Sequence, residues 1–245
     1  MIDWLLDPDH WLGSDGISTL LLQHLQYSGI SILIAMVIGL PIGLFVGHTG
    51  RGTFLIAGAA NATRALPSLG LIVLLVILVG PYFKSDLAFL VPSIAVLVLI
   101  AVPPMMMGAY AGVASVDASA VDAARGMGYR PLTLLFTVEV PCALPLIFSG
   151  IRSAALQVVS TATIAAYVSL GGLGRLIIDG RAQNDYVKMA VGAVLVGLLA
   201  LLIDLVFGLA SRFTVSPGLS RRTVKTAVLR RHGAKENNAT SRGKS

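Results

Sequence analysis

The feature that most constrains this chain is a series of long apolar stretches, each near the length that crosses a lipid bilayer. A helix of about 20 apolar residues spans the hydrocarbon core of a membrane. Only 12% of the residues are charged, against about 25% in soluble domains, too few to cover a water-facing surface. We therefore expect an all-α integral membrane protein with one transmembrane domain of five or six spans. The apolar stretches cover about residues 27–47, 54–80, 87–108, 132–170 and 189–210.

The second of these stretches, 54–80, is long for one straight helix, and Arg64 and Pro67 interrupt it. Proline removes a backbone donor and clashes with the preceding turn. We interpret the stretch as one helix kinked near Pro67, with two short helices as the alternative.

The first stretch contains Gly39, Gly43 and Gly47, which recur every four residues. This spacing predicts a helix face that another helix can approach closely. Before it, residues 16–26 place leucine and isoleucine at helical spacing with Gln23 and His24 on the other side, which predicts an amphipathic helix at the membrane interface.

Charge is distributed unevenly along the chain, and the distribution predicts its orientation. Nine of the 18 Lys and Arg residues lie between Arg212 and Lys244, whereas the first 15 residues hold four Asp and no Lys or Arg. Basic segments stay in the cytosol, so the N-terminus should lie outside and the C-terminus inside. Five spans satisfy this arrangement better than six. No basic region precedes the first apolar stretch, so we expect no cleaved signal peptide.

These patterns divide the chain into an N-terminal interfacial segment (1–22), a transmembrane domain (23–211) and a basic cytosolic tail (212–245), expected to be disordered beyond Pro217. The tail suits contact with anionic lipids, and the lack of interleaved aromatic residues argues against nucleic-acid binding. Cys142 is the only cysteine, which excludes an internal disulfide and a paired-thiolate metal site. His24 alone does not predict a metal site.

A short helix is predicted in the loop between the third and fourth stretches. Asp117 is a favourable N-cap, and the alanines that follow favour a helix. Gly126 and Gly128 can end it, and Pro131 stops its continuation. A helix of about ten residues with such small side chains can lie in a groove of a partner protein; the alternative is a helix that rests on the membrane surface.

This loop resembles the cytosolic loop of importer permeases in the ABC superfamily. Its pattern is Glu-Ala-Ala, a glycine six positions after the Glu, and a hydrophobic-x-hydrophobic-Pro ending. The segments Asp122-Ala123-Ala124, Gly128 and Val138-x-Val140-Pro141 match it, with Asp in place of Glu. In that family the loop forms a coupling helix that docks on the ATPase subunit. The resemblance therefore assigns ATPase coupling to Asp117, Asp122, Ala123, Ala124, Arg125, Gly126, Gly128 and Pro141.

Further segments are similar to the subfamily that imports osmoprotectants such as glycine betaine, choline or carnitine, with methionine-importer permeases as more distant relatives. The resemblance implies a five-helix type I importer domain in a bacterial inner membrane. Its expected partners are two ATPase subunits, a second permease of the same or a sister sequence, and an external binding protein. The matching segments are Ala65-Leu66-Pro67-Ser68, Ala124-Arg125-Gly126-Met127-Gly128, Ser149-Gly150-Ile151-Arg152 and Gly171-Gly172-Leu173-Gly174.

The chain lacks the motifs of an ATPase or a hydrolase. No G-x-x-x-x-G-K-[ST], H-E-x-x-H or G-x-S-x-G occurs, so we expect no catalytic residue and no cofactor, with ATP and Mg bound by the partner ATPase. Aromatic residues that could cage a quaternary ammonium are scattered. A secondary transporter or channel is the rival class. Such proteins often show internal repeats, none is clear in this sequence, and the alanine-rich helix would lack a purpose. An amino acid or another small solute is the rival cargo.

Charged residues within apolar stretches need a role. Glu139 lies near the cytosolic end and can be solvated there. Arg152 is the deepest, and Asp204 in the last stretch is a plausible partner for it. The candidates for the transport path or for an interface are Arg64, Pro67, Arg152 and Asp204.

Overall fold

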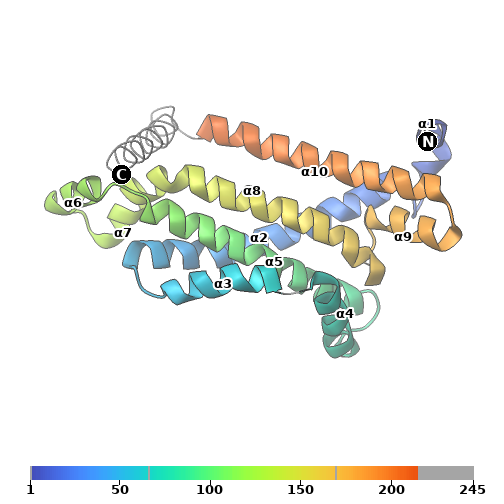
Figure 1. Cartoon of the computed structure of the whole chain (residues 1–245), viewed down its shortest axis with the longest axis horizontal. Coiled ribbons are helices and arrows are strands. Elements are labelled where there is room, and N and C mark those ends of the chain that lie inside the picture. The colour runs from blue at the N-terminus through green and yellow to red at the C-terminus, as the bar shows by residue number, and fades with distance from the viewer. Residues whose placement is uncertain (1, 66, 169, 215–245) are drawn as a thin grey trace, which may run out of the picture.

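The computed structural model describes residues 2–65, 67–168 and 170–214, and side chains within 4–61, 67–168 and 170–211. The described residues form an elongated bundle of helices (Figure 1). The elements are α1 (Ile2–Leu6), η1 (Pro8–His10), α2 (Ile17–Thr49), α3 (Thr53–Ala65), α4 (Ser68–Val79), η2 (Gly80–Tyr82), α5 (Leu87–Ala114), α6 (Ala118–Gly126), α7 (Pro131–Leu134), η3 (Leu135–Glu139), α8 (Val140–Ala165), η4 (Ala166–Val168), α9 (Gly174–Gln183) and α10 (Tyr186–Thr214).

Helix α2 is a single helix of 33 residues. The expected separate interfacial helix over 16–26 is therefore wrong, and α2 also runs through the expected domain boundary at residue 22. The physical reason is one continuous buried face, whose members recur every three or four residues and hold the whole helix against the bundle. These residues are Ile17, Leu20, His24, Ser28, Ser31, Ala35, Gly39, Gly43 and Val46.

The glycine face of α2 packs on α5, as its spacing predicted. A Cβ atom added to Gly39 would lie 3.0 Å from the carbonyl oxygen of Val102, and one added to Gly47 would lie 2.7 Å from the Cβ of Val113. At Gly43 an added Cβ would overlap the carbonyl oxygen of Met106. Only glycine permits the two backbones to come this close.

The stretch over 54–80 is broken into two helices, so the single kinked helix is wrong and its alternative holds. Pro67 stands between α3 and α4 with an extended backbone (φ −71°, ψ 107°). The helix is interrupted here because proline lacks the amide hydrogen of a helical bond and disfavours the helical conformation in the residue before it. In Figure 1, α3 follows the long axis of the bundle and α4 turns away from it.

Helices α5 and α8 form the centre of the bundle, together with α2. The buried core between them is built from aliphatic side chains of moderate size, such as Val96, Leu97, Met105, Ile147 and Val158. Helix α8 continues from α7 and η3, so residues 131–168 form one long helical unit. The polar segment after it contains the short helix α9.

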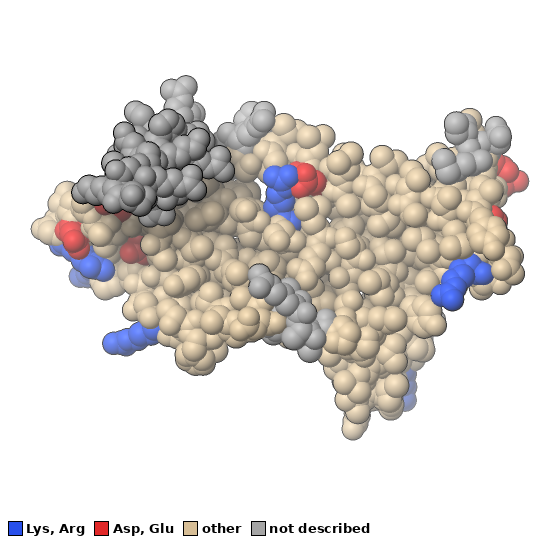
Figure 2. Space-filling model, in the orientation of Figure 1, with Lys and Arg blue, Asp and Glu red and all other residues tan. Residues whose placement is uncertain are grey.

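Four helical units among the described residues are long and apolar enough to cross a membrane: Ile17–Thr49, Leu87–Ala114, Pro131–Val168 and Tyr186–Ser211. Ser68–Tyr82 is a shorter apolar helix, and with α3 it takes the place of the remaining expected span. Charged side chains gather mainly toward the two ends of the long axis, with a blue and red pair near the middle (Figure 2). The expected disorder beyond Pro217 lies outside the described residues.

Candidate coupling helix and charged pairs of the membrane core

Helix α6 lies at one end of the bundle, opposite the N-terminus and α9 (Figure 1). Its start is set by Asp117, whose backbone is extended and whose Oδ1 accepts hydrogen bonds from the N–H of Ser119 (3.0 Å) and from its hydroxyl (2.9 Å). This satisfies an amide that the first helical turn leaves without a partner. The N-cap expected from the sequence is confirmed.

The end of α6 depends on Gly128, whose φ of 84° lies in the left-handed region. The N–H of Gly128 donates to the carbonyl of Arg125 (2.9 Å), and the N–H of Tyr129 donates to that of Ala124 (3.2 Å). This pair of bonds is the Schellman ending of a helix, in which glycine is favoured at the left-handed position. Gly126 is helical, so of the two expected terminators Gly128 ends the helix.

The side chains of α6 are mostly exposed. Ala124 is buried, at 2% exposed, whereas Asp122, Ala123 and Arg125 are exposed. Asp122 and Arg125 form an ion pair of 3.6 Å on this open face, which contributes little in water. The helix thus presents a thin, alanine-rich surface outward.

Helix α6 contacts η3, a π-helical segment that leads into α8. The N–H of Val140 bonds to the carbonyl of Leu135, five residues back. Pro141 follows in the first turn of α8 and has no N–H to offer to the preceding turn. A π-helical turn of this kind often marks a functional site.

Glu139 emerges from η3 and is buried, at 4% exposed. Its Oε2 lies 2.6 Å from Nδ1 of His48 at the C-terminal end of α2. The expectation that Glu139 is solvated is wrong, because α2 and η3 enclose it. His48 was not among the residues singled out from the sequence. It directly follows the apolar stretch 27–47, and a polar residue at that position was the available signal.

The pairing of Arg152 with Asp204 is confirmed. Arg152 on α8 donates from Nε to Oδ1 and from a terminal nitrogen to Oδ2 of Asp204 on α10, both at 2.5 Å. This bidentate geometry joins residues 52 apart in the sequence and neutralises two charges within membrane-spanning helices. Pro67 lies at the break between α3 and α4, away from this pair; the side chain of Arg64 lies outside the described residues.

The Gly-Gly-Leu-Gly segment packs on the N-terminal half of α2. Gly171 and Gly172 have positive φ values (88° and 76°), and the N–H of Gly172 donates to Oε1 of Gln23 (3.1 Å). His24, expected as an interfacial residue, is instead 1% exposed, with Nε2 3.1 Å from the carbonyl oxygen of Val159. The motif thus fastens the turn after α8 to α2.

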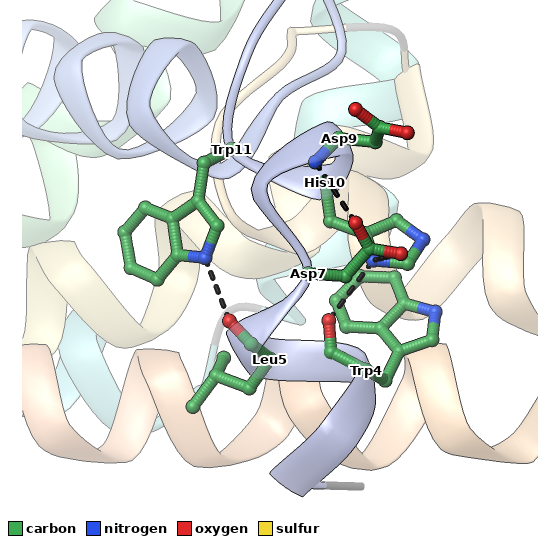
Figure 3. A network of polar contacts seen from close by, with 6 residues as sticks. All are labelled: Trp4, Leu5, Asp7, Asp9, His10 and Trp11. Atoms are coloured by element: carbon green, nitrogen blue, oxygen red, sulfur yellow. Dashed lines mark hydrogen bonds and ion pairs between the residues drawn. The ribbon is translucent and has the colours of Figure 1, made fainter.

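The N-terminal segment folds into a compact turn (Figure 3) at the end of the bundle opposite α6 (Figure 1). The ring of His10 stacks on that of Trp4 with 3.8 Å between centroids, and its Nδ1 lies 2.9 Å from the Trp4 carbonyl oxygen. Nε1 of Trp11 donates to the carbonyl oxygen of Leu5 (2.7 Å). The turn therefore has its own polar contacts and lies far from α6.

A bundle with four helical units long and apolar enough to cross a membrane among the described residues, and a short alanine-rich helix exposed at one end, has the architecture of a multi-pass membrane protein. A family model described as "Binding-protein-dependent transport system inner membrane component" matches residues 39–215. The chain belongs to this family and is a permease subunit of an ABC importer, a multi-pass protein of the inner membrane. This membership excludes a secondary transporter or channel.

Relatives and solved structures agree with the family. The chain is 31% identical over 207 residues to the osmoprotectant import permease OsmW of Salmonella typhimurium, covering 83% of this chain and 91% of that protein. It is 29% identical over 199 residues to the choline permease OpuBB of Bacillus subtilis, covering 81% and 88%. The inward-facing MetNI methionine ABC transporter has the same fold, with a TM-score of 0.69 at 22% identity over 86% of this chain and 99% of that one.

Proposed function

We propose that this chain forms the translocation path of an importer for an osmoprotectant such as glycine betaine, choline or carnitine, and that α6 couples it to a separate ATPase subunit. The observation that carries the coupling proposal is the open face of α6. A helix capped at both ends, alanine-rich outward and fixed to the bundle through Ala124 is built to enter a groove on another protein.

The proposed cargo follows from the relatives. The names of relatives that cover more than four-fifths of the chain specify choline, glycine betaine, carnitine or osmoprotectants. The likeness to the methionine transporter concerns the fold alone, so methionine is the control cargo rather than a second candidate.

The proposed assembly holds two ATPase subunits, which bind ATP and Mg, a second permease of the same or a sister sequence, and an external binding protein, within the membrane lipids. This chain contributes no ATPase and no nucleic-acid contact. The C-terminus and α6 lie in the cytosol. Arg51, Arg125 and Arg130 lie in the segments that connect the long helices at the α6 end, which supports this orientation.

Uptake by the complete complex in proteoliposomes tests the cargo. Labelled glycine betaine, choline, carnitine and methionine would be offered with the binding protein outside and ATP inside. We expect ATP-dependent accumulation of at least one of the first three and none of methionine. Accumulation of methionine alone would contradict the osmoprotectant proposal while leaving the importer proposal intact.

A pair of reporter fusions tests the orientation. A reporter after Ser245 should be active only in the cytosol, and one before Trp4 only outside it. The reverse pattern would place α6 outside the cell and refute its coupling role.

A further inference from the structure

We propose that the cargo path follows a groove between α5 and α8 whose polar wall is formed by Ser149, Ser153 and Gln157. This inference rests on the proposed importer function and names the residues that meet the cargo. The groove has a volume of about 370 Å³. Its other lining residues are Ala60 of α3, Pro104, Met107 and Gly108 of α5, and Leu146 and Gly150 of α8.

The groove lies where α5 and α8 cross at two glycines. A Cβ atom added to Gly108 would lie 2.8 Å from the Cα of Gly150, and one added to Gly150 would lie 2.7 Å from the carbonyl oxygen of Pro104. The two backbones touch here, and only glycine at both positions permits so close a crossing. In Figure 1, α5 runs between α3 and α8, the three helices that border the groove.

The polar wall is a stripe along one face of α8. Ser149, Ser153, Gln157 and Ser160 are spaced by four, four and three residues, which places them on the same side of a helix. At 1.5 Å per residue the stripe is about 16 Å long, roughly half of the 30 Å hydrocarbon thickness. Ser149 and Ser153 are exposed and Gln157 is partly exposed.

This stripe differs from the other exposed faces of the bundle. The outward face of α10 carries large apolar side chains, among them Leu198, Leu202 and Leu205, which are 56–58% exposed and suit contact with lipid. Hydrocarbon offers no partners to hydroxyl and amide groups. A polar face halfway across the membrane therefore indicates contact with water and a polar solute.

The lining suits a small solute without net charge, or a quaternary ammonium that must pass without being held. No Lys, Arg, Asp or Glu is among the described residues that line the groove, so nothing there repels or traps a cation. The hydroxyl O–H and amide N–H groups can donate hydrogen bonds to a carboxylate. Arg152 and Asp204 do not line this groove, so their pair is separate from the path.

Chemical labelling tests the proposal in the assembled transporter. Cys142→Ser removes the single cysteine, after which Ser149→Cys, Ser153→Cys or Gln157→Cys adds one to the wall. The probe is a methanethiosulfonate that carries a trimethylammonium group, which resembles choline in its charge. Leu205→Cys is the control at the same depth, because the Arg152–Asp204 pair aligns this part of α10 with residues 149–153 of α8.

We expect labelling at the three wall positions at least about tenfold faster than at position 205, because the reactive thiolate forms in water and not in hydrocarbon. Glycine betaine or choline, offered with the binding protein, should slow the labelling. Ser153→Leu, which fills the groove without adding charge, should lower uptake while leaving the membrane level unchanged.

Labelling no faster than at position 205 would overturn the proposal. So would disulfide formation between two copies of the Ser153→Cys chain in place of labelling, since the stripe would then be a contact between permeases. Uptake by the Cys142→Ser complex separates a failure of the proposed path from a failure of the proposed importer function. Normal uptake without wall labelling refutes the path alone, whereas a complex with the unsubstituted chain that takes up no osmoprotectant refutes the proposed function.

Discussion

The Nδ1 atom of His48 and the Oε2 atom of Glu139 lie 2.6 Å apart, which joins the C-terminal end of α2 to the π-helical segment in contact with α6. The pair is largely enclosed, with 15% and 5% of the two side chains exposed. It is the polar link between a long spanning helix and the proposed docking end, so its energetics can be tested by removing one partner or both.

His48→Leu should destabilise the chain by about 1–3 kcal/mol, because it leaves the buried carboxyl group of Glu139 without its partner. Glu139→Leu should also destabilise it. The double substitution should recover much of the loss, since an apolar pair leaves no buried polar group unsatisfied. Thermal unfolding in detergent measures the cycle; losses that simply add would show that the two residues do not interact.

Ala123→Trp should abolish uptake and cargo-stimulated ATP hydrolysis while leaving the membrane level near normal. Ala123 is exposed on α6, so the chain itself can accommodate the ring, but a partner groove cannot. Ala124→Trp is the contrasting variant, because Ala124 is buried and the level itself should fall. Normal uptake by Ala123→Trp would contradict docking through this face.

Gly128→Ala should raise the free energy of the folded α6 ending by about 1–2 kcal/mol, because a residue with a side chain is strained at the φ of 84° found at this position. Gly128→Asp adds charge at the proposed contact and should also abolish uptake, whereas Asp122→Glu should be tolerated. Gly126→Ala is the matched control, since Gly126 is helical and a Cβ there meets nothing within 4 Å. Uptake and ATP hydrolysis by the assembled complex measure all four variants; equal effects of the two alanine substitutions would contradict the role of Gly128.

Arg152→Leu should lower the membrane level of the chain, because it leaves Asp204 without its bidentate partner within a spanning helix. The double substitution Arg152→Leu and Asp204→Leu should restore both the level and the uptake, since the pair lies outside the groove that we assign to the path. Quantitative immunoblots of membranes and uptake assays measure this. A restored level with uptake still lost would show that the charges serve transport.

Gly43→Ala should destabilise the bundle by about 1–3 kcal/mol, because its Cβ would overlap the Met106 carbonyl oxygen where α2 meets α5. Gly197→Ala on α10 is the control, with nothing within 4 Å of its added Cβ, and it should be neutral or slightly stabilising. Melting temperatures in detergent compare the two. Equal temperatures would contradict the close packing of α2 on α5.

The sequence determined the features that depend on neighbouring residues. Apolar stretches near bilayer length fix where helices cross, and the caps at Asp117 and Gly128 fix a short helix, because each signal acts within a few residues along the chain. The spacing of Gly39, Gly43 and Gly47 likewise predicted a close helix contact. The Arg152–Asp204 pair followed from the cost of an isolated charge in a membrane.

Only the tertiary structure decided what depends on packing between distant segments. The length of α2 follows from a buried face that extends to Ile17, and local amphipathicity could not show this. Whether Pro67 kinks or breaks its helix depends on what α3 and α4 pack against. Glu139 is buried against His48, which is 91 positions away in the sequence. The groove lies where Gly108 meets Gly150, which is 42 positions away. Such contacts arise when helices dock, because side-chain environments are set by neighbours in space and not in sequence.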